Sequence, residues 1–316
     1  MKKILNTLDV HDIPEFTKIL SCVGRLTNIE AERKKVLSEI KDSYAYLASA
    51  SIQVDEEFLE NASNLKVIGS PSTGTDHLDL ELIKKRKIIC YDISKEFALI
   101  NTFTATSELA FTLLLSLLRN IVPAVSDAKK GLWSREKYSG RQLFGKNFGI
   151  IGLGRLGVIA AKIANGFGMN VLAYDIENKS VDNVTMVDID TLAVESDFIS
   201  IHVHLNALTE GLINKDLFKK MKKTAIIINT SRGKVINESD LLYALENKLI
   251  DGAGLDVIDG EWLTEKEIYN HPLIKFSREN NNLLITPHIG GATKESITGA
   301  RIFMAEKVAS FLISYR

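Results

Sequence analysis

The sequence predicts an α/β protein built from two parallel-sheet units, and three observations support this prediction. Short apolar runs alternate with amphipathic helical patterns over the first hundred residues, and the same alternation resumes after residue 146. One long apolar helical stretch separates the two regions. Strands that alternate with helices are typical of parallel sheets with helical crossovers. At 316 residues the chain is long enough for about two such units.

The first unit is predicted from four short apolar runs with helical patterns between them. The runs are KILNTL (3–8), YAYLASA (44–50), LKVIGS (65–70) and KIICYD (87–92). Amphipathic periodicity predicts helices over NIEAERKKVLSEI (28–40) and HLDLELIKKR (77–86). A single long helix, from Thr104 to Lys129, is predicted to lead to the second unit.

The second unit is predicted from six further apolar runs. They are NFGIIG (147–152), NVLAYD (170–175), FISIHV (198–203), AIIINT (225–230), GAGLDV (252–257) and NLLITPH (282–288). A final helix, capped by Thr293, is predicted to reach the C-terminus. The fold class is therefore α/β, with two Rossmann-like or flavodoxin-like parallel-sheet domains.

Composition narrows the classes of function. A formal net charge of −1 and a pI near 6.6 give no broad basic surface, so neither nucleic acid nor an anionic membrane is an expected partner. The most apolar helical stretch, LAFTLLLSLL (109–118), is too short for a bilayer. Two cysteines, Cys22 and Cys90, lack a C-x-x-C spacing. We expect a cytoplasmic protein, and no metal site is predicted.

A glycine motif gives the clearest cofactor signal. Gly152, Gly154 and Gly157 fit G-x-G-x-x-G directly after a predicted strand and at the start of a helix. Such glycines permit a tight turn, close approach of a pyrophosphate and close packing of helix on strand. Asp175 ends the next strand, where a carboxylate accepts ribose hydroxyls and repels a 2′-phosphate. NAD is the predicted cofactor; the choice over NADP depends on Asp175 pointing toward the ribose.

Six motifs together give the chain a resemblance to the D-isomer-specific 2-hydroxyacid dehydrogenase family, which includes phosphoglycerate dehydrogenase. They are GTDHLD (74–79), TSELAFTLLLSLLRN (106–120), the glycine motif, NTSRG (229–233), GAGLDV (252–257) and TPHIGG (286–291). The resemblance implies a substrate domain of residues 1–99 and 289–316, an NAD-binding Rossmann domain of residues 100–288, and an active site in the cleft between them.

Three residues match the family's catalytic positions. Arg232 ends a strand that is predicted to be buried, and its planar guanidinium suits a substrate carboxylate and the adjacent carbonyl oxygen. Taken alone, an arginine that caps a strand on the surface is an equal alternative. His288 resembles the general acid and base, and Glu261 the carboxylate that orients the imidazole and favours its protonated form.

The resemblance also implies the residues that bind cofactor and substrate. Beyond the three glycines and Asp175, the expected cofactor-binding residues are Thr106, Arg155, Leu156, His204, Thr209, Thr230, Ser231, Asp256, Gly290 and Gly291. Asp256 has a structural alternative, the capping of a strand end. Backbone N–H groups at Ser72, Thr73 and Gly74, together with Arg232, are expected to bind the substrate carboxylate.

The expected function is NAD-dependent interconversion of a D-2-hydroxy acid and a 2-oxo acid. A corepressor-like protein that senses NAD(H) on the same fold is the alternative. The family is usually dimeric, and Leu113, Leu114, Leu117 and Leu118 form a candidate interface, although core packing explains them equally. Two departures from the family pattern are His204 and Trp262, which stand where proline is frequent.

Overall fold

The structure is a computed structural model that describes residues 1–261 and 263–315. The chain divides into two compact units, residues Met1–Phe103 with Thr293–Arg316 and residues Thr104–Ala292. Each boundary lies four residues later than the predicted one, at 103 rather than 99 and at 292 rather than 288. Trp262 lies outside the described residues.

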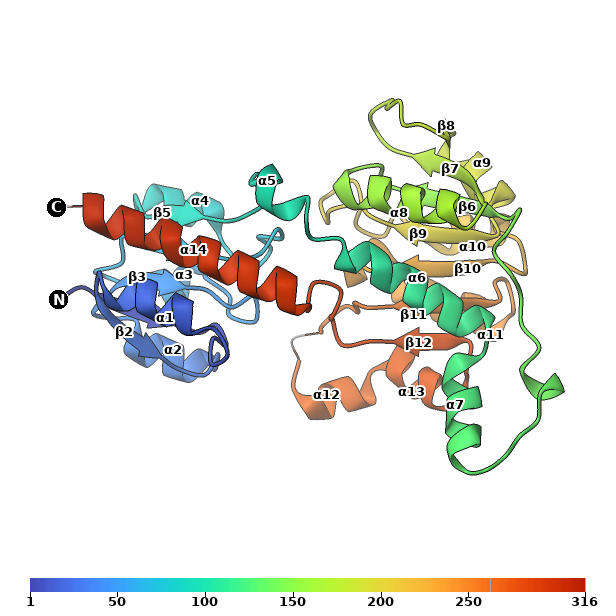
Figure 1. Ribbon diagram of the computed structural model, residues 1–316, viewed down its shortest axis with the longest axis horizontal. Helices are drawn as coiled ribbons and strands as arrows, with labels where there is room; N and C mark the ends of the chain where they lie inside the picture. Colours follow the sequence, from blue (N-terminus) through green and yellow to red (C-terminus); the bar gives the residue numbers. More distant parts are fainter. Residues whose placement is uncertain (262, 316) are drawn as a thin grey trace. The chain divides into compact units, whose positions relative to one another are not determined.

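The first unit contains a five-stranded parallel sheet among its described residues, in the order β2-β1-β3-β4-β5 (Figure 1). Its strands are β1 (Lys3–Asn6), β2 (Arg25–Asn28), β3 (Ser43–Leu47), β4 (Val67–Gly69) and β5 (Ile89–Tyr91). Its helices are α1 (Pro14–Ser21), α2 (Arg33–Glu39), α3 (Glu56–Asn61), α4 (Leu80–Lys85), α5 (Phe97–Ile100) and α14 (Lys294–Ser314).

The C-terminal helix α14 belongs to the core of this first unit. Thr293 caps it by accepting a hydrogen bond from the N–H of Ser296. Met304 and Val308 pack so closely on β4 that a Cβ at Gly69 would lie 2.8 Å from each side chain. The segment farthest along the sequence therefore completes the unit that the N-terminus begins (Figure 1).

The second unit contains a seven-stranded parallel sheet among its described residues, in the order β12-β11-β10-β9-β6-β7-β8. Its strands are β6 (Asn147–Ile151), β7 (Asn170–Tyr174), β8 (Val184–Met186), β9 (Phe198–Ile201), β10 (Ile226–Asn229), β11 (Gly252–Leu255) and β12 (Leu283–Ile285). Its α-helices are α6 (Ala105–Leu118), α7 (Ile121–Lys129), α8 (Arg155–Gly166), α9 (Ile189–Glu195), α10 (Lys215–Lys220), α11 (Glu238–Glu246), α12 (Glu265–Asn270) and α13 (Pro272–Glu279). Among its described residues it also has the 3₁₀ turns η1 (Glu136–Tyr138) and η2 (Gly233–Val235).

Helices cover both faces of this sheet, as apolar strands require. The helices α6 and α8 pack with one face, and α9, α10, α11 and α13 contribute to the apolar cluster on the other. Strand β10 lies between β9 and β11, and all four of its residues are buried. The predicted α/β fold with two parallel sheets is confirmed.

The predicted long helix from Thr104 to Lys129 is wrong. The structure has two helices, α6 and α7, separated by Asn120 in the left-handed region at φ 51°. Pro123 supplies the physical reason, because proline has no N–H and its ring clashes with the preceding helical turn. It is tolerated in the first turn of α7, so the helix ends before it and begins again.

One stretch, Phe97–Leu118, is long and apolar enough to cross a membrane by length and composition. In the structure it is not one helix, since α5 ends at Ile100 in the first unit and α6 begins at Ala105 in the second. Within the second unit, α6 buries Phe111, Leu113 and Leu114 against the sheet and α8. Packing in a protein core accounts for these apolar residues.

Candidate functional site

The turn after β6 has the features predicted for its three glycines: a tight turn, an open backbone and a helix packed close to the strand. Gly152 has φ 96°, and a Cβ there would lie 2.7 Å from the carbonyl oxygen of His202. A Cβ at Gly157 would lie 2.1 Å from the carbonyl oxygen of Gly152, whereas one at Gly154 would enter open space. The turn is tight, the helix lies close to the strand, and the backbone at Gly154 is open to a ligand.

The N-terminus of α8 provides donors at this turn. Its N-cap residue, Gly154, has no side chain that could accept from the first-turn N–H groups. The helix has 12 residues, so its positive dipole end is well formed. Arg155 and Leu156 are the first two helical residues. These features fit the pyrophosphate of a dinucleotide.

Asp175 follows β7 and points back to the glycine turn. Its Oδ2 accepts from the N–H of Leu153 at 2.7 Å, and its Oδ1 accepts from the N–H of Glu177 at 3.0 Å. Lys179 Nζ lies 3.0 Å from Oδ2. Burial raises the pKa of Asp175, but these N–H groups and the ammonium outweigh it and lower the pKa below its usual value. The carboxylate is ionised near neutral pH at the place where a ribose is expected.

The carboxyl end of β10 presents the next polar residues. Thr230 is buried, and its Oγ1 has no hydrogen-bond partner among the described residues. The N–H and hydroxyl of Ser231 both donate to Asn229 Oδ1, and Asn229 Nδ2 donates to the carbonyl oxygen of Arg232. This side-chain turn fixes the backbone from which the Arg232 guanidinium extends. The buried Thr230 hydroxyl next to this turn is available to form a hydrogen bond with a ligand.

A backbone contact connects the Arg232 segment to the loop that carries Glu261. A Cβ at Gly233 would lie 2.1 Å from the carbonyl carbon of Ile258 and 2.3 Å from the nitrogen of Asp259. Only glycine allows two backbones to approach this closely. Gly233 therefore brings the strand end that bears Arg232 against the loop that bears Glu261.

His288 and Glu261 form a hydrogen-bonded pair. His288 Nδ1 and Glu261 Oε1 are 2.8 Å apart, with side chains 34% and 18% exposed. Because a carboxylate only accepts, the geometry assigns the proton to Nδ1 in the neutral imidazole. Nε2 is then the nitrogen with a lone pair for proton exchange. The second Glu261 oxygen, Oε2, is buried without a hydrogen-bond partner among the described residues.

The backbone of His288 is held in an uncommon conformation by Asp256. His288 has φ 53°, and its N–H donates to the carbonyl oxygen of Asp256 at 2.8 Å. Asp256 Oδ1 accepts from Thr286 Oγ1 and the N–H of Ile289, and Oδ2 accepts from the N–H of Gly290 at 2.7 Å. Non-glycine residues at positive φ persist where their surroundings hold them. Asp256 thus does cap a strand end, and it positions the segment that carries the imidazole.

Thr106 and the glycines after His288 lie next to Asp256. A Cβ at Gly290 would lie 2.9 Å from Asp256 Oδ2 and 3.2 Å from Thr106 Cγ2, whereas one at Gly291 would enter open space. These predicted cofactor residues are therefore neighbours in the second unit. On the loop after β9, the carbonyl oxygen of the exposed His204 accepts a hydrogen bond from Thr209 Oγ1 at 2.6 Å.

Two residues that the sequence analysis did not single out support the Glu261 loop. Glu238, at the start of α11, accepts from the N–H of Asp259 at 2.7 Å through Oε1, and its Oε2 lies 3.1 Å from His271 Nε2. Burial raises the pKa of Glu238, while the Asp259 N–H and His271 act in the opposite direction. The sequence around Glu238 shows only the capping pattern at the start of α11. That pattern does not predict the contact between Glu238 and Asp259, 21 residues later.

We expect Glu238→Ala to lower kcat/KM about tenfold. The change leaves the Asp259 N–H, which lies at an exposed position, without its protein acceptor, a loss of about 1 kcal/mol for a typical hydrogen bond, and frees the loop that orients Glu261. Glu238→Gln keeps an acceptor at the same place and should retain most activity. Steady-state kinetics test this, with Glu246→Ala on the exposed face of α11 as the control. Normal kinetics in folded Glu238→Ala would show that Glu238 does not position the loop.

His202, a half-buried histidine outside the pair, lies beside the glycine turn. Burial lowers the pKa of His202 to about 4, so its imidazole is neutral near pH 7. Its Nε2 lies 2.9 Å from Ser200 Oγ, within the wall of the glycine turn. His202 therefore helps to shape the turn as a neutral side chain.

The predicted substrate loop lies in the first unit, after β4. Ser70 Oγ lies 2.9 Å from Ser72 Oγ and 3.1 Å from the Nε2 of buried His77, and Ser72 Oγ donates to the carbonyl oxygen of Gly74 at 2.8 Å. The N–H groups of Ser72, Thr73 and Gly74 have no acceptor among the described residues. The loop is held by its own side chains while its N–H groups stay available to an anion.

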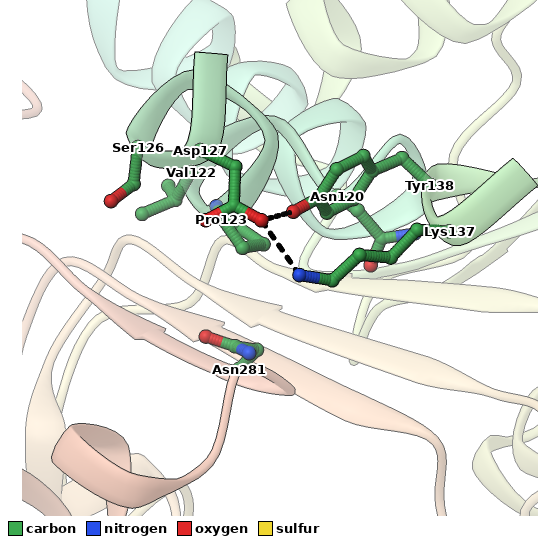
Figure 2. Close-up of a pocket in the computed structure, with 8 residues that line it drawn as sticks. All are labelled: Asn120, Val122, Pro123, Ser126, Asp127, Lys137, Tyr138 and Asn281. Atoms are coloured by element: carbon green, nitrogen blue, oxygen red, sulfur yellow. Dashed lines mark hydrogen bonds and ion pairs between the residues drawn. The ribbon is translucent and has the colours of Figure 1, made fainter. Parts of the chain in front are cut away.

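A separate pocket of about 480 Å³ lies where α6 meets α7 (Figure 2). Asp127 there accepts from Lys137 Nζ at 2.6 Å and from the Tyr138 hydroxyl at 2.5 Å. Asn281, on its other side, precedes β12 and so lies at the amino end of that strand. None of the predicted site residues lines this pocket, whereas the polar residues described above lie at carboxyl ends of strands, where open parallel sheets bind ligands.

Comparisons with known proteins agree with this organisation. Residues 4–96 match the catalytic domain of the D-isomer specific 2-hydroxyacid dehydrogenases, and residues 111–290 match their NAD binding domain. The chain is 39% identical over 291 residues to a glyoxylate reductase of Thermofilum pendens, covering 89% of this chain and 81% of that protein. It is 33% identical over 320 residues to a D-3-phosphoglycerate dehydrogenase of Methanocaldococcus jannaschii, covering 99% of this chain and 58% of that protein.

Solved structures show the same fold. A D-lactate dehydrogenase from Aquifex aeolicus, complexed with NAD and lactic acid, has a TM-score of 0.86 and 28% identity, with 99% of this chain and 96% of that chain covered. The named relatives are oxidoreductases, and they give no support to the corepressor-like alternative. The chain belongs to the D-isomer specific 2-hydroxyacid dehydrogenase family and is an NAD-dependent oxidoreductase of that family.

Proposed function

We propose that this chain reduces a small, unphosphorylated 2-oxo acid of the size of glyoxylate or hydroxypyruvate to the D-2-hydroxy acid. The proposed chemistry rests on the hydrogen bond between His288 Nδ1 and Glu261 Oε1, which are 2.8 Å apart. The similarity to glyoxylate reductases, which extends to 38–39% identity in two of them, supports the substrate class.

In the proposed reaction, the hydride that reduces the carbonyl carbon would come from bound NADH. Arg232 binds the substrate carboxylate and the carbonyl oxygen, and its fixed charge stabilises the negative charge that develops on that oxygen. His288 donates a proton from Nε2 to the same oxygen, which leaves a hydroxyl. In the reverse direction the neutral Nε2 accepts that proton.

The proposed binding roles follow the polar groups at the strand ends. The N–H groups of Ser72, Thr73 and Gly74 would bind the substrate carboxylate together with Arg232. The glycine turn with Arg155 and Leu156 would hold the pyrophosphate, and Asp175 the adenosine ribose. Towards the nicotinamide end we assign Thr106, His204, Thr209, Thr230, Ser231, Asp256, Gly290 and Gly291.

A panel of 2-oxo acids tests this function. Loss of NADH absorbance is measured with glyoxylate, hydroxypyruvate, pyruvate, 2-oxoglutarate and phosphonooxypyruvate. We expect the highest kcat/KM with glyoxylate or hydroxypyruvate. The highest value with phosphonooxypyruvate would instead support a phosphoglycerate dehydrogenase, and turnover of none of them in a protein that binds NADH would contradict the proposal.

We also propose that the protein is a cytoplasmic homodimer. The sequence suggested the leucines of α6 as a candidate interface. Leu113, Leu114 and Leu118 are instead buried in the core, so they are not available to a second copy. Exposed apolar side chains gather instead on α7 and the segment after it: Ile121, Val122, Val125, Leu132 and Trp133. Trp133 is 91% exposed. A second copy of this chain is the partner that we assign to this surface, since the family is usually dimeric.

A further inference from the structure

Two buried side chains, Ser70 and His77, support the predicted substrate loop after β4. Ser70 Oγ lies 3.1 Å from His77 Nε2 and 2.9 Å from Ser72 Oγ, so one buried hydroxyl contacts both side chains. Ser72 Oγ in turn lies 2.8 Å from the carbonyl oxygen of Gly74. These contacts form a chain from a buried imidazole to the part of the loop whose N–H groups are assigned to the substrate carboxylate.

The number of protons fixes the direction of this chain. A carbonyl oxygen only accepts, so the single hydroxyl proton of Ser72 is donated to Gly74. Ser72 Oγ then accepts from Ser70, and this contact uses the single hydroxyl proton of Ser70. Ser70 Oγ is left to accept from His77, so the geometry assigns a proton to His77 Nε2. A bare Nε2 would place two lone pairs against each other at one of the contacts.

Backbone hydrogen bonds hold the two ends of this loop. The carbonyl oxygen of His77 accepts from the N–H of Val54 at 2.7 Å, and the N–H of Asp79 donates to the carbonyl oxygen of Val54 at 3.0 Å. The carbonyl oxygen of Ser72 accepts from the N–H of Ile93 at 3.3 Å. The segments that follow β3 and β5 therefore hold the ends of the loop, while its interior depends on the hydrogen bonds that begin at His77 Nε2.

The last hydrogen bond of the chain acts on a flexible position. Glycine has the backbone that turns most readily, so the peptide after Gly74 has little to hold it except the Ser72 hydroxyl. If that peptide turned, its carbonyl oxygen could face a bound carboxylate and repel it. Donors that are held in place before an anion binds give higher affinity, because less ordering is needed on binding.

We propose that His77 is a positioning residue for the substrate carboxylate. Its Nε2–H, acting through the hydroxyls of Ser70 and Ser72, fixes the peptide of Gly74 and with it the N–H groups of the loop. The inference rests on the role of this loop in the proposed function and deepens it. His77 gives no proton to the substrate, so it needs only a donor at Nε2. The side-chain amide of glutamine can supply a donor at about that position.

Steady-state kinetics with glyoxylate at saturating NADH test the proposal. His77→Leu and the milder Ser70→Ala should each raise KM about tenfold, the scale of one lost hydrogen bond at a site for a charged ligand. The kcat should stay within about twofold, because Arg232 and His288 lie in the second unit. His77→Gln should keep KM within about twofold of the wild type. The dissociation constant of oxamate, an unreactive carboxylate, from the NADH complex should rise by the same factor as KM.

Ser43→Ala is the matched control, because it removes the hydrogen bond of another buried hydroxyl in the same unit, at the amino end of β3. It should leave both KM and kcat near their wild-type values. An unchanged KM in folded His77→Leu and Ser70→Ala would overturn the proposal. So would a loss of kcat and NADH affinity as large as the rise in KM, because that result would indicate a general defect of the fold.

Nitrogen-15 NMR of labelled histidine rings tests the direction of the chain without turnover. The ring signals of His77 are those that disappear in His77→Gln, and we expect a proton on Nε2 in the wild type. A bare Nε2 in a wild type that reduces glyoxylate would overturn this inference alone. A wild type that binds NADH and reduces none of the 2-oxo acids would overturn the proposed function, so the two failures are distinguishable.

Discussion

Arg232→Lys should lose at least about 10²-fold in turnover of the 2-oxo acid, the scale seen when one oxyanion donor is removed. Lysine keeps the positive charge but loses the planar pair of donors that grips a carboxylate and a carbonyl oxygen together. The loss should appear in kcat as well as in KM, because the interaction with the carbonyl oxygen strengthens as negative charge develops on it.

Contacts that do not involve the guanidinium hold the backbone of Arg232, namely the Asn229 side chain and the close approach of Gly233 to Ile258 and Asp259. The guanidinium also donates from Nη1 to the carbonyl oxygen of Ser231 at 2.8 Å, a local contact that lysine weakens. Arg278→Lys, at an exposed arginine of α13, provides the control for a change of the same kind elsewhere in this unit. A folded Arg232→Lys variant with near-normal kinetics would remove Arg232 from the proposed chemistry.

The sequence alone predicted those parts of the site that depend on residues close together in the chain. An apolar strand, a glycine turn and a helix are enough to predict a dinucleotide site, and the turn at Gly152 needs the positive φ that glycine allows. Arg232 was placed by its position after a buried strand. The catalytic assignment of Glu261 and His288 needed the family motifs, because no pattern in the sequence around either residue indicates that the two side chains pair across 27 residues.

Other features could not be predicted because they depend on contacts between separate segments. Glu238 meets Asp259 only after α11 and the loop following β11 have packed together. Lys179 lies near Asp175 in sequence, but its loop has no pattern that fixes the side chain. The edge strands β2 and β8 were missed because they are short and partly exposed, so that they lack the apolar signal of central strands. The break at Asn120 did have a signal, Pro123, which the predicted long helix ignored.

The His288 and Glu261 pair leads to the second large expected effect, a loss of turnover when the carboxylate is replaced. Glu261 Oε1, 2.8 Å from His288 Nδ1, accepts the ring proton there and leaves Nε2 for proton exchange with the substrate oxygen. Glu261→Gln keeps the shape, but its amide can donate to Nδ1 and so favour the other tautomer of the ring. We expect kcat/KM to fall at least about 10²-fold in both directions, the scale of general acid–base catalysis.

His288→Ala should abolish turnover in both directions while cofactor binding is retained, because the proton donor is lost but the glycine turn is untouched. Glu265→Gln, at an exposed carboxylate that begins α12, is the control for the loss of one nearby negative charge. It should leave kcat/KM near the wild-type value in both directions.

The most direct test is kcat/KM in both directions for wild type, Glu261→Gln and His288→Ala, with cofactor saturating and folding checked by circular dichroism. We expect Glu261→Gln to lose at least about 10²-fold in both directions, because the 2.8 Å contact of Glu261 Oε1 with Nδ1 holds the imidazole in the tautomer that the reaction uses. Near-wild-type kcat/KM in folded Glu261→Gln would contradict the claim that this carboxylate orients the acid and base of the reaction.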